Sequence, residues 1–368
     1  MAYLPSELFV CPDDKALLLF KQNSYFCTHC GKTYVVKGDV PDFMAVSNEV
    51  ETIQKDLYEK MAGSITSYRY FLEYPYLLNH FHRKEWIDLL KIKPGMKILE
   101  LGTQNGVHIR YLKHRYPFIS NNDIVGVDIA IKPLQMGRIA DTFHYTAASI
   151  YNLPFADTTF DIVLMPGILE HLEDPLSAIK EVSRVMKENA EYSAYFVVKD
   201  YGFSFHWVTN DFLKIKRLIK KNTVDIGHDF ETVIQRYDTY ADCLTRNGLI
   251  IERKRRVNLI LEPTIDFIFS KLLELVKIPF RMVKYVSAKK LSSNNIGDVR
   301  SPVIPSGNHQ ASNMRDYIFL IMHYTMKIVY ILSKVEGLFL GTSCGLSVLI
   351  HGRKRTTLMV GKEAQIKK

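Results

Sequence analysis

Apolar runs alternate with amphipathic helical patterns between residues 96 and 200. The runs are MKILELG, DIVGVDI, FDIVLM and YSAYFVVKD. Strands that alternate with helices are typical of a parallel sheet with crossover helices. Residues 231–257 repeat this arrangement, with a helix that closes at Gly248 and is followed by the strand LIIERKRRV. The pattern therefore predicts an α/β fold with a mostly parallel sheet.

The two ends of the chain have a different character. Residues 1–44 contain many turn residues and predict a compact unit, whereas residues 259–343 contain two long apolar and basic helical stretches around a polar loop. The segment CGLSVLIHGRK, within residues 344–368, predicts a last short strand before a basic tail. We therefore expect an N-terminal unit over 1–44, an α/β core over 45–258, a helical insertion over 259–343, and the last strand and tail.

Composition narrows the class of protein. The chain has 368 residues, of which 47% are hydrophobic and 24% are charged, so it can bury a substantial core. Its formal net charge of +9 favours anionic partners such as nucleic acid, phospholipid headgroups or phosphorylated substrates. The start lacks the basic and apolar regions of a signal peptide, and the odd number of cysteines, 5, does not suit a secreted disulfide scaffold. These features predict a cytoplasmic protein.

The first strand of the core is followed by a tight turn. Ile98–Leu101 predicts a buried strand, Thr103 to Gly106 form the turn, and VHIRYLKHRY begins a helix. Small residues let the backbone approach a ligand, and the helix N-terminus offers N–H groups to a carboxylate or phosphate. Asp128 ends the second strand, where an acidic side chain is placed to bind ribose hydroxyls. These features predict a nucleotide-type cofactor at this edge of the sheet.

Two further segments extend the motif set. NLPFADTTFD precedes the fourth strand of the core, and GILEHLEDP follows it. With these segments, residues 68–258 resemble the class I S-adenosylmethionine-dependent methyltransferases, in the subgroup that methylates small molecules. That family shows an E-x-G-x-G-x-G turn, an acidic end of the second strand, LPF-x-D-x-x-FD and LEH-x-x-DP. The resemblance implies S-adenosylmethionine as cofactor and a Rossmann-like, seven-stranded sheet with helices on both faces.

The resemblance also implies a set of cofactor residues: Glu100, Gly102, Thr103, Gln104, Gly106, Asp128, Ile129, Ser149, Ile150 and Met165. Met165 would lie just past the fourth strand, beside the adenine or the methionine moiety. Two positions depart from the family. Gln104 replaces its middle glycine, and Ser149 replaces an acidic residue that often meets the adenine amino group. A nicotinamide-binding Rossmann domain and a fold that has lost its ligand are the alternatives, and the LPF and LEH segments argue against a dehydrogenase.

Candidate catalytic residues follow the fourth and fifth strands. His171 lies after the fourth strand and could act as a base on an acceptor. Asp200 and His206 follow the fifth strand and could line the acceptor pocket. The alternative for all three is an ordinary role in helix capping, loop structure or packing.

Three of the cysteines lie in the N-terminal unit. Cys11, Cys27 and Cys30, with Asp14 where a zinc ribbon would have its second cysteine, resemble a zinc-ribbon module. Two pairs of ligands on facing turns would give zinc a tetrahedral shell, here through three sulfurs and one carboxylate oxygen. A zinc ion in such a unit would be structural. The alternative is a ribbon that keeps its fold by packing and has lost zinc.

The insertion combines apolar and basic residues. Residues 263–290 place apolar positions at helical spacing with lysines between them, which predicts either a lid over the acceptor site or a helix on an anionic membrane surface. The nearest candidate for a bilayer span, Tyr317–Ser333, is interrupted by His323 and Lys327. Peripheral contact with the inner face of a membrane is therefore an alternative to a freely cytoplasmic protein. The basic runs at residues 214–221 and 253–256 are typical of solvated faces, so we do not favour nucleic acid as a partner.

These features together predict methyl transfer to a small-molecule, saccharide or lipid-linked acceptor, at oxygen. An RNA methyltransferase, in which the ribbon and the basic runs grip phosphates, is one alternative. A non-catalytic protein that binds S-adenosylmethionine is the other.

Overall fold

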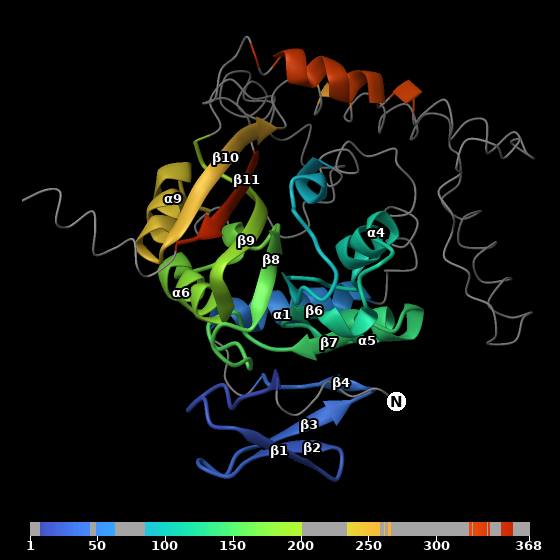
Figure 1. The fold of residues 1–368 in the computed structure, drawn as a ribbon, viewed down its shortest axis with the longest axis vertical. Helices are drawn as coiled ribbons and strands as arrows, with labels where there is room; N and C mark the ends of the chain where they lie inside the picture. Colours follow the sequence, from blue (N-terminus) through green and yellow to red (C-terminus); the bar gives the residue numbers. More distant parts are fainter. Residues whose placement is uncertain are drawn as a thin grey trace, which may run out of the picture.

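The computed structural model describes residues 8–44, 49–62, 85–200, 234–257 and 347–355, together with short pieces at 261, 264–265, 324–325, 327–336 and 338. Figure 1 shows a central sheet with helices around it and a small set of strands at one end. His206, residues 214–221, and most of the predicted insertion, including residues 266–290, lie outside the described residues.

The central sheet has seven strands in the order β10-β11-β9-β8-β5-β6-β7. Their bounds are β5 Ile98–Leu101, β6 Ile124–Asp128, β7 His144–Ala147, β8 Phe160–Pro166, β9 Met186–Val197, β10 Leu249–Val257 and β11 Ser347–Lys354. Strands β7, β6, β5, β8 and β9 pair in parallel, and β11 pairs antiparallel with both β9 and β10. The predicted seven-stranded, mostly parallel Rossmann-like sheet is confirmed.

Apolar side chains cover both faces of this sheet. Alternate residues of a strand point to opposite faces, so Leu99 and Leu101 of β5 join one hydrophobic cluster, and Ile98 joins the other. The first cluster includes α6 (Pro175–Val185) and α9 (Tyr237–Arg246), and the second includes α4 (Val107–Arg115) and α5 (Ile131–Ala140). Helices therefore pack on both faces, and the carboxyl ends of the parallel strands stay open between them.

Local capping explains where α6 begins. Asp174 accepts a hydrogen bond from the backbone N–H of Ser177 at 3.2 Å, which satisfies one of the free donors of the first turn. Pro175 occupies the first helical turn, where its missing N–H costs nothing. The DP pair of the LEH-x-x-DP segment is thus a helix start directly after the strand end that borders the site.

The N-terminal unit is a four-stranded antiparallel sheet of β1 (Leu18–Lys21), β2 (Ser24–Cys27), β3 (Thr33–Lys37) and β4 (Val40–Pro41). Figure 1 shows it at the β7 edge of the central sheet. Phe9 stacks on Phe155 of the LPF segment with ring centroids 5.7 Å apart, and Phe43 N donates to Ala147 O at 2.8 Å. The unit therefore shares a hydrophobic core with the α/β domain instead of standing apart from it.

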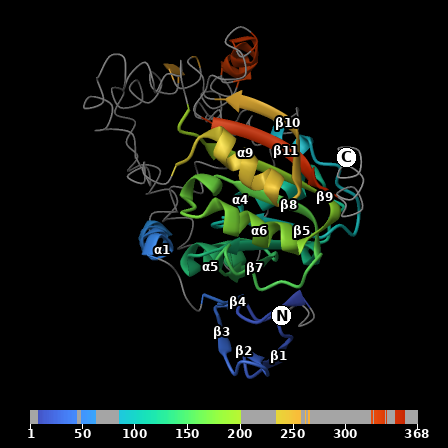
Figure 2. The same ribbon diagram turned by 90° about the vertical axis from the view of Figure 1, so that its left-hand side faces the viewer.

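A further helix, α1 (Glu49–Ala62), follows the N-terminal unit. It lies beside α5, as Figure 2 shows, and Glu59 accepts hydrogen bonds from the backbone N–H groups of Ile131 and Lys132 at the start of α5. Among the described residues, no helix combines the length and apolar character that crossing a bilayer requires.

Candidate functional site

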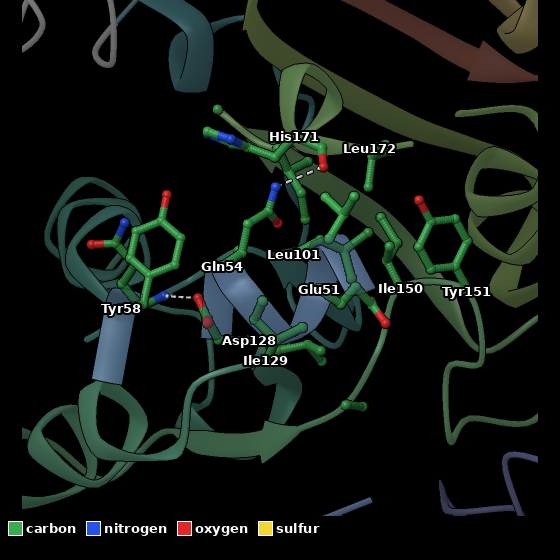
Figure 3. A pocket seen from close by; sticks show the side chains of 17 residues that line it. Glu51, Gln54, Tyr58, Leu101, Asp128, Ile129, Ile150, Tyr151, His171 and Leu172 are labelled. Atoms are coloured by element: carbon green, nitrogen blue, oxygen red, sulfur yellow. Dashed lines mark hydrogen bonds between the residues drawn. The ribbon is translucent and has the colours of Figure 1, made fainter. Parts of the chain in front are cut away.

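A pocket opens at the carboxyl ends of the parallel strands and is covered by α1 (Figure 3). The residues that line it are Val50, Glu51, Gln54 and Tyr58 from α1, Leu101, Gly102 and Gln104 from the end of β5 and its turn, Val127, Asp128 and Ile129 from the end of β6 and the position after it, Ala148, Ile150 and Tyr151 after β7, and Gly167, Ile168, His171 and Leu172 after β8. Ligands of open α/β sheets bind at this edge. The pocket contains several of the predicted cofactor residues and none of the predicted metal ligands.

The turn after β5 places three residues in the left-handed region. Gly102, Gln104 and Gly106 have φ angles of 71°, 49° and 80°. Gln104 takes this conformation at the position where the resembled family has its middle glycine, so the turn keeps its shape at the expense of backbone strain. Gly106 has a second constraint, because a Cβ atom there would stand 1.9 Å from Tyr145 Oη. Backbone geometry and packing thus both shape this turn.

Glu100 supports the turn from behind. Its side chain is fully buried and does not line the pocket. The carboxylate accepts a hydrogen bond from Thr103 Oγ1 at 2.5 Å and pairs with His108 Nδ1 at 2.8 Å. Glu100 and Thr103 therefore support the turn from inside the protein, whereas Gly102 and Gln104 border the pocket.

Asp128 lies in the centre of the pocket wall. Its Oδ2 accepts from the backbone N–H of Gln104 at 2.9 Å, and its Oδ1 accepts from that of Ala130 at 3.0 Å (Figure 3). Burial raises the pKa of Asp128 from 3.8 to about 6. The two backbone bonds orient the carboxylate and tie the first turn to the end of β6.

Helix α1 adds polar groups that sequence reasoning did not identify. Glu51 is 6% exposed, and its Oε1 accepts a hydrogen bond from Ser149 Oγ at 2.6 Å. Gln54 Nε2 donates to the backbone oxygen of His171 at 2.9 Å (Figure 3). No motif in the sequence marks which residues of α1 reach the sheet edge.

Two predicted cofactor residues take other positions. Met165 was expected just past the fourth strand, but β8 continues to Pro166 and the Met165 side chain is fully buried in the cluster that packs on α6. Gly167 and Ile168 border the pocket in its place. Ser149 does not line the pocket directly and acts through its bond to Glu51. Ile129 and Ile150 line it as expected.

The LEH segment presents His171 and Glu170 differently. His171 lines the pocket at the end of a short 3₁₀ helix, Leu169–His171. Glu170 turns into the protein, where its Oε1 accepts from Val197 N at 3.3 Å and its Oε2 has no hydrogen-bond partner among the described residues. Burial raises the pKa of Glu170 from 4.5 to about 7.

Asp200 is engaged in a structural contact. It pairs with Arg256 at 2.6 Å and accepts from the backbone N–H of Tyr237 at 2.8 Å. Burial raises the pKa of its carboxyl, but these two donors outweigh that effect and hold the pKa below its usual value. Within the described residues, Asp200 is not part of the pocket, and it joins β9 to α9 and β10.

The structure brings the four predicted metal ligands together. The donor atoms of Cys11, Asp14, Cys27 and Cys30 all lie within 4.8 Å of one another. Cys11 Sγ is 3.6 Å from Cys30 Sγ, close to the separation of about 3.8 Å that tetrahedral zinc with Zn–S bonds near 2.3 Å requires. His29 Nδ1 lies 2.8 Å from Asp14 Oδ2, so His29 orients a ligand without belonging to the set. The donor set fits a structural zinc ion.

Part of this chain is similar in sequence to known proteins. Residues 99–193 match a family model described as a methyltransferase domain. The chain is 28% identical over 110 residues to cycloartenol-C-24-methyltransferase 1 of Oryza sativa subsp. japonica, which covers 29% of this chain and 32% of that protein. It is 29% identical over 115 residues to the ubiquinone biosynthesis O-methyltransferase of Hahella chejuensis, and this match covers 30% of this chain and 46% of that protein. An uncharacterized methyltransferase of Schizosaccharomyces pombe is 51% identical over 109 residues, and this match covers 26% of this chain and 38% of that protein.

Among solved structures, the complex of the Haloferax volcanii Trm112 methyltransferase activator with a putative methyltransferase aligns with a TM-score of 0.44 and 13% identity, over 82% of this chain and 97% of that one. The chain spans less than half of the length of these curated relatives. The family match nevertheless lies on the strands and turns that build the pocket. Residues 99–193 are therefore a methyltransferase domain, as the motifs predicted.

Proposed function

We propose that this protein binds S-adenosylmethionine in the pocket under α1 and transfers its methyl group to a small-molecule acceptor. One observation carries the proposal: the strained turn at residues 102–106 and the Asp128 carboxylate are hydrogen-bonded to each other and face the same pocket, within the segment that matches a methyltransferase domain. The turn leads into the N-terminus of α4, and a helix N-terminus suits the cofactor's carboxylate, while an acidic side chain beside it suits the ribose.

Methyl transfer mainly requires that the acceptor atom is aligned with the methyl group. The bound cofactor supplies a methyl group on a sulfonium, which is already a good electrophile. The chain must therefore hold the acceptor in line with that group and exclude water. Helix α1 covers the pocket and is fixed by Gln54 to the LEH segment, so it contributes to both tasks.

An acceptor hydroxyl would also need a base. His171 lines the pocket at the carboxyl end of β8, and we propose that it takes the acceptor proton. Asp200 is occupied by Arg256, which makes it a poorer candidate for this role. Oxygen stays our proposed acceptor atom.

The acceptor is proposed to be a small or lipid-like molecule. The curated relatives carry names that refer to sterol, quinone and phosphoethanolamine methylation. RNA is less favoured, because two arginines of the basic run at residues 253–256 are already paired: Arg255 with Glu85, and Arg256 with Asp200. A saccharide or lipid-linked acceptor, and contact of residues 263–290 with an anionic membrane, remain sequence-based predictions.

Binding and transfer test the proposal in turn. Titration of the purified protein with S-adenosylhomocysteine in a calorimeter should show binding of one molecule per chain. Methyl transfer from labelled S-adenosylmethionine is then measured on a panel of phenolic, quinol, sterol and phosphoethanolamine acceptors. No heat at millimolar ligand with folded protein would overturn the proposal, and binding without transfer to any acceptor would favour a non-catalytic binding protein.

The variant His171→Ala tests the proposed base. Turnover on a hydroxyl acceptor should fall by about a hundredfold or more, while the affinity for S-adenosylhomocysteine should change little. His114→Ala, in the exposed last turn of α4, is the matched control and should keep full turnover.

A further inference from the structure

We propose that Glu51, on α1, is the residue that recognises the adenine amino group of the cofactor. The inference rests on the proposed function, because it concerns the same pocket. It assigns a specificity-determining role to a helix that precedes the strands of the methyltransferase domain.

The order of the strands indicates where each part of the cofactor would lie. Neighbouring strands β8, β5, β6 and β7 end along the pocket in that order. The turn at Gly102 and the LEH segment occupy the β5 and β8 side, which suits the amino-acid moiety and the methyl group. Asp128, at the end of β6, suits the ribose. The base must then extend from the ribose toward β7, where Ala148 and Ile150 line the pocket.

Glu51 stands at this β7 side of the pocket. Its carboxylate is 2.6 Å from the hydroxyl of Ser149, which lies between the two β7 lining residues. Figure 3 shows Glu51 close to Ile150, with Tyr58 at the other end of the pocket along α1. The base would therefore lie between apolar side chains, with the carboxylate at its outer edge.

The chemistry of Glu51 matches an amino group. An ionised carboxylate has about four acceptor sites and no donor, and the hydroxyl of Ser149 uses one of these sites. The environment is apolar around Val50, Ile129 and Ile150, and Glu51 is 6% exposed, so a charge-assisted hydrogen bond there should be strong. The exocyclic amine of adenine is a donor of this kind, and the ring nitrogens of adenine are not.

Ser149 has a positioning role in this arrangement. Its hydroxyl bonds to Glu51 and also accepts from the backbone N–H of Tyr151 at 3.1 Å, so its rotamer is fixed from two sides. The loop after β7 brings no carboxylate of its own at this position. Glu51 brings one from α1 to the same place, so docking of α1 completes the base subsite.

A cycle of two proteins and two ligands tests the inference. Wild type and Glu51→Gln are titrated with S-adenosylhomocysteine and with its analogue whose purine lacks the 6-amino group. Wild type should prefer the amino-bearing ligand by about tenfold or more, the effect of one hydrogen bond to a charged group. In Glu51→Gln that preference should fall to less than about threefold, while the affinity for the analogue should stay near that of wild type.

Further variants separate recognition from structure. Glu49→Gln changes an exposed acid in the first turn of the same helix and should leave both affinities unchanged. Glu51→Gln combined with Ser149→Asp moves the carboxylate to the loop after β7 and should restore part of the preference. If Glu51→Gln does not fold, Glu51→Ala replaces it in the cycle, with the same expected loss of preference.

The outcomes are distinct. If wild type does not bind S-adenosylhomocysteine at all, the proposed function fails and this inference fails with it. If wild type binds, but the preference for the amino group is absent or survives in the Glu51 variants, the proposed function stands and the role of Glu51 is overturned.

Discussion

Gly106 lies directly beneath the hydroxyl group of Tyr145, and a Cβ atom at Gly106 would stand 1.9 Å from that oxygen. Tyr145 belongs to β7, its side chain is buried, and its hydroxyl donates to Asp141 Oδ2 at 2.8 Å. The turn after β5 is thus packed against a strand two places away in the sheet. The contact therefore holds the turn after β5 against β7, and the residues after both strands border the pocket.

The variant Gly106→Ala should therefore lower the free energy of unfolding by about 3 kcal/mol or more, since strain at positive φ and overpacking act together. Gly95→Ala is the control, because Gly95 has a φ of +77° and a Cβ atom there would meet no heavy atom within 4 Å beyond its chain neighbours. It should cost only about 1 kcal/mol, from backbone strain alone. Urea unfolding followed by circular dichroism measures both, and equal losses would contradict the role of Tyr145.

Gln104 tests the strain of the same turn. Gln104→Gly should unfold at a temperature equal to or above that of wild type, because glycine adopts the φ of 49° without strain and this gain offsets the added freedom of the unfolded chain. Gln104→Val should be less stable than wild type by about 1–2 kcal/mol, because a β-branched side chain tolerates this region poorly. Thermal unfolding compares them, and a more stable valine variant would show that the turn is not strained.

Asp128 should make cofactor affinity depend on pH. The pKa of Asp128 is raised to about 6, and its ionised form accepts the hydrogen bonds, so the affinity for S-adenosylhomocysteine should fall as the pH is lowered from 7.5 to 5. Asp128→Asn should bind about tenfold or more weakly at pH 7.5 and lose this dependence. Asp238→Asn, on the exposed start of α9, is the control. Calorimetry that shows the same pH profile for Asp128→Asn and wild type would argue against this role.

Glu170 should make stability depend on pH. The folded protein keeps the Glu170 proton up to a pKa of about 7, whereas the unfolded chain releases it near 4.5, so stability falls as the pH rises through that window. Glu170→Gln cannot release a proton and so avoids this loss of stability. The free energy of unfolding of the variant, relative to that of wild type, should therefore rise by up to about 3 kcal/mol between pH 4.5 and pH 8. Asp128 contributes equally to both proteins. Urea unfolding at the two pH values measures the difference in free energy of unfolding between variant and wild type. If this difference is the same at both pH values, the raised pKa of Glu170 is contradicted.

The N-terminal donor set should hold one zinc ion per chain after expression with sufficient metal. Cys27→Ser removes a buried ligand and should lose most of the metal and several degrees of melting temperature, since the unit shares its core with the α/β domain. Cys243→Ser, a buried cysteine of α9 outside the set, should keep its metal. Elemental analysis by mass spectrometry measures the zinc content of each protein. Well under one zinc ion per chain in wild type would show that the ribbon does not bind zinc.

Local sequence determined a large part of this picture. The alternation of apolar strands with amphipathic helices encodes the parallel sheet, and Gly102 and Gly106 encode the turn after β5, because each of these features depends on neighbours within a few residues. The left-handed turn formed even with Gln104 in it. The three cysteines and Asp14 could be grouped because their pattern resembles a zinc ribbon, and the structure brings their donor atoms together.

Tertiary structure alone decided which side chains share the pocket. Glu51 and Ser149 are hydrogen-bonded although they are 98 positions apart in the sequence, and Arg256 and Asp200 are paired at a separation of 56 positions. No local pattern encodes such pairs. Met165 was misplaced by the length of β8, since its burial depends on how far the strand continues and which face packs on α6. Contacts of this kind depend on the docking of whole elements, where register and packing are set by the complete core and not by any one segment of the chain.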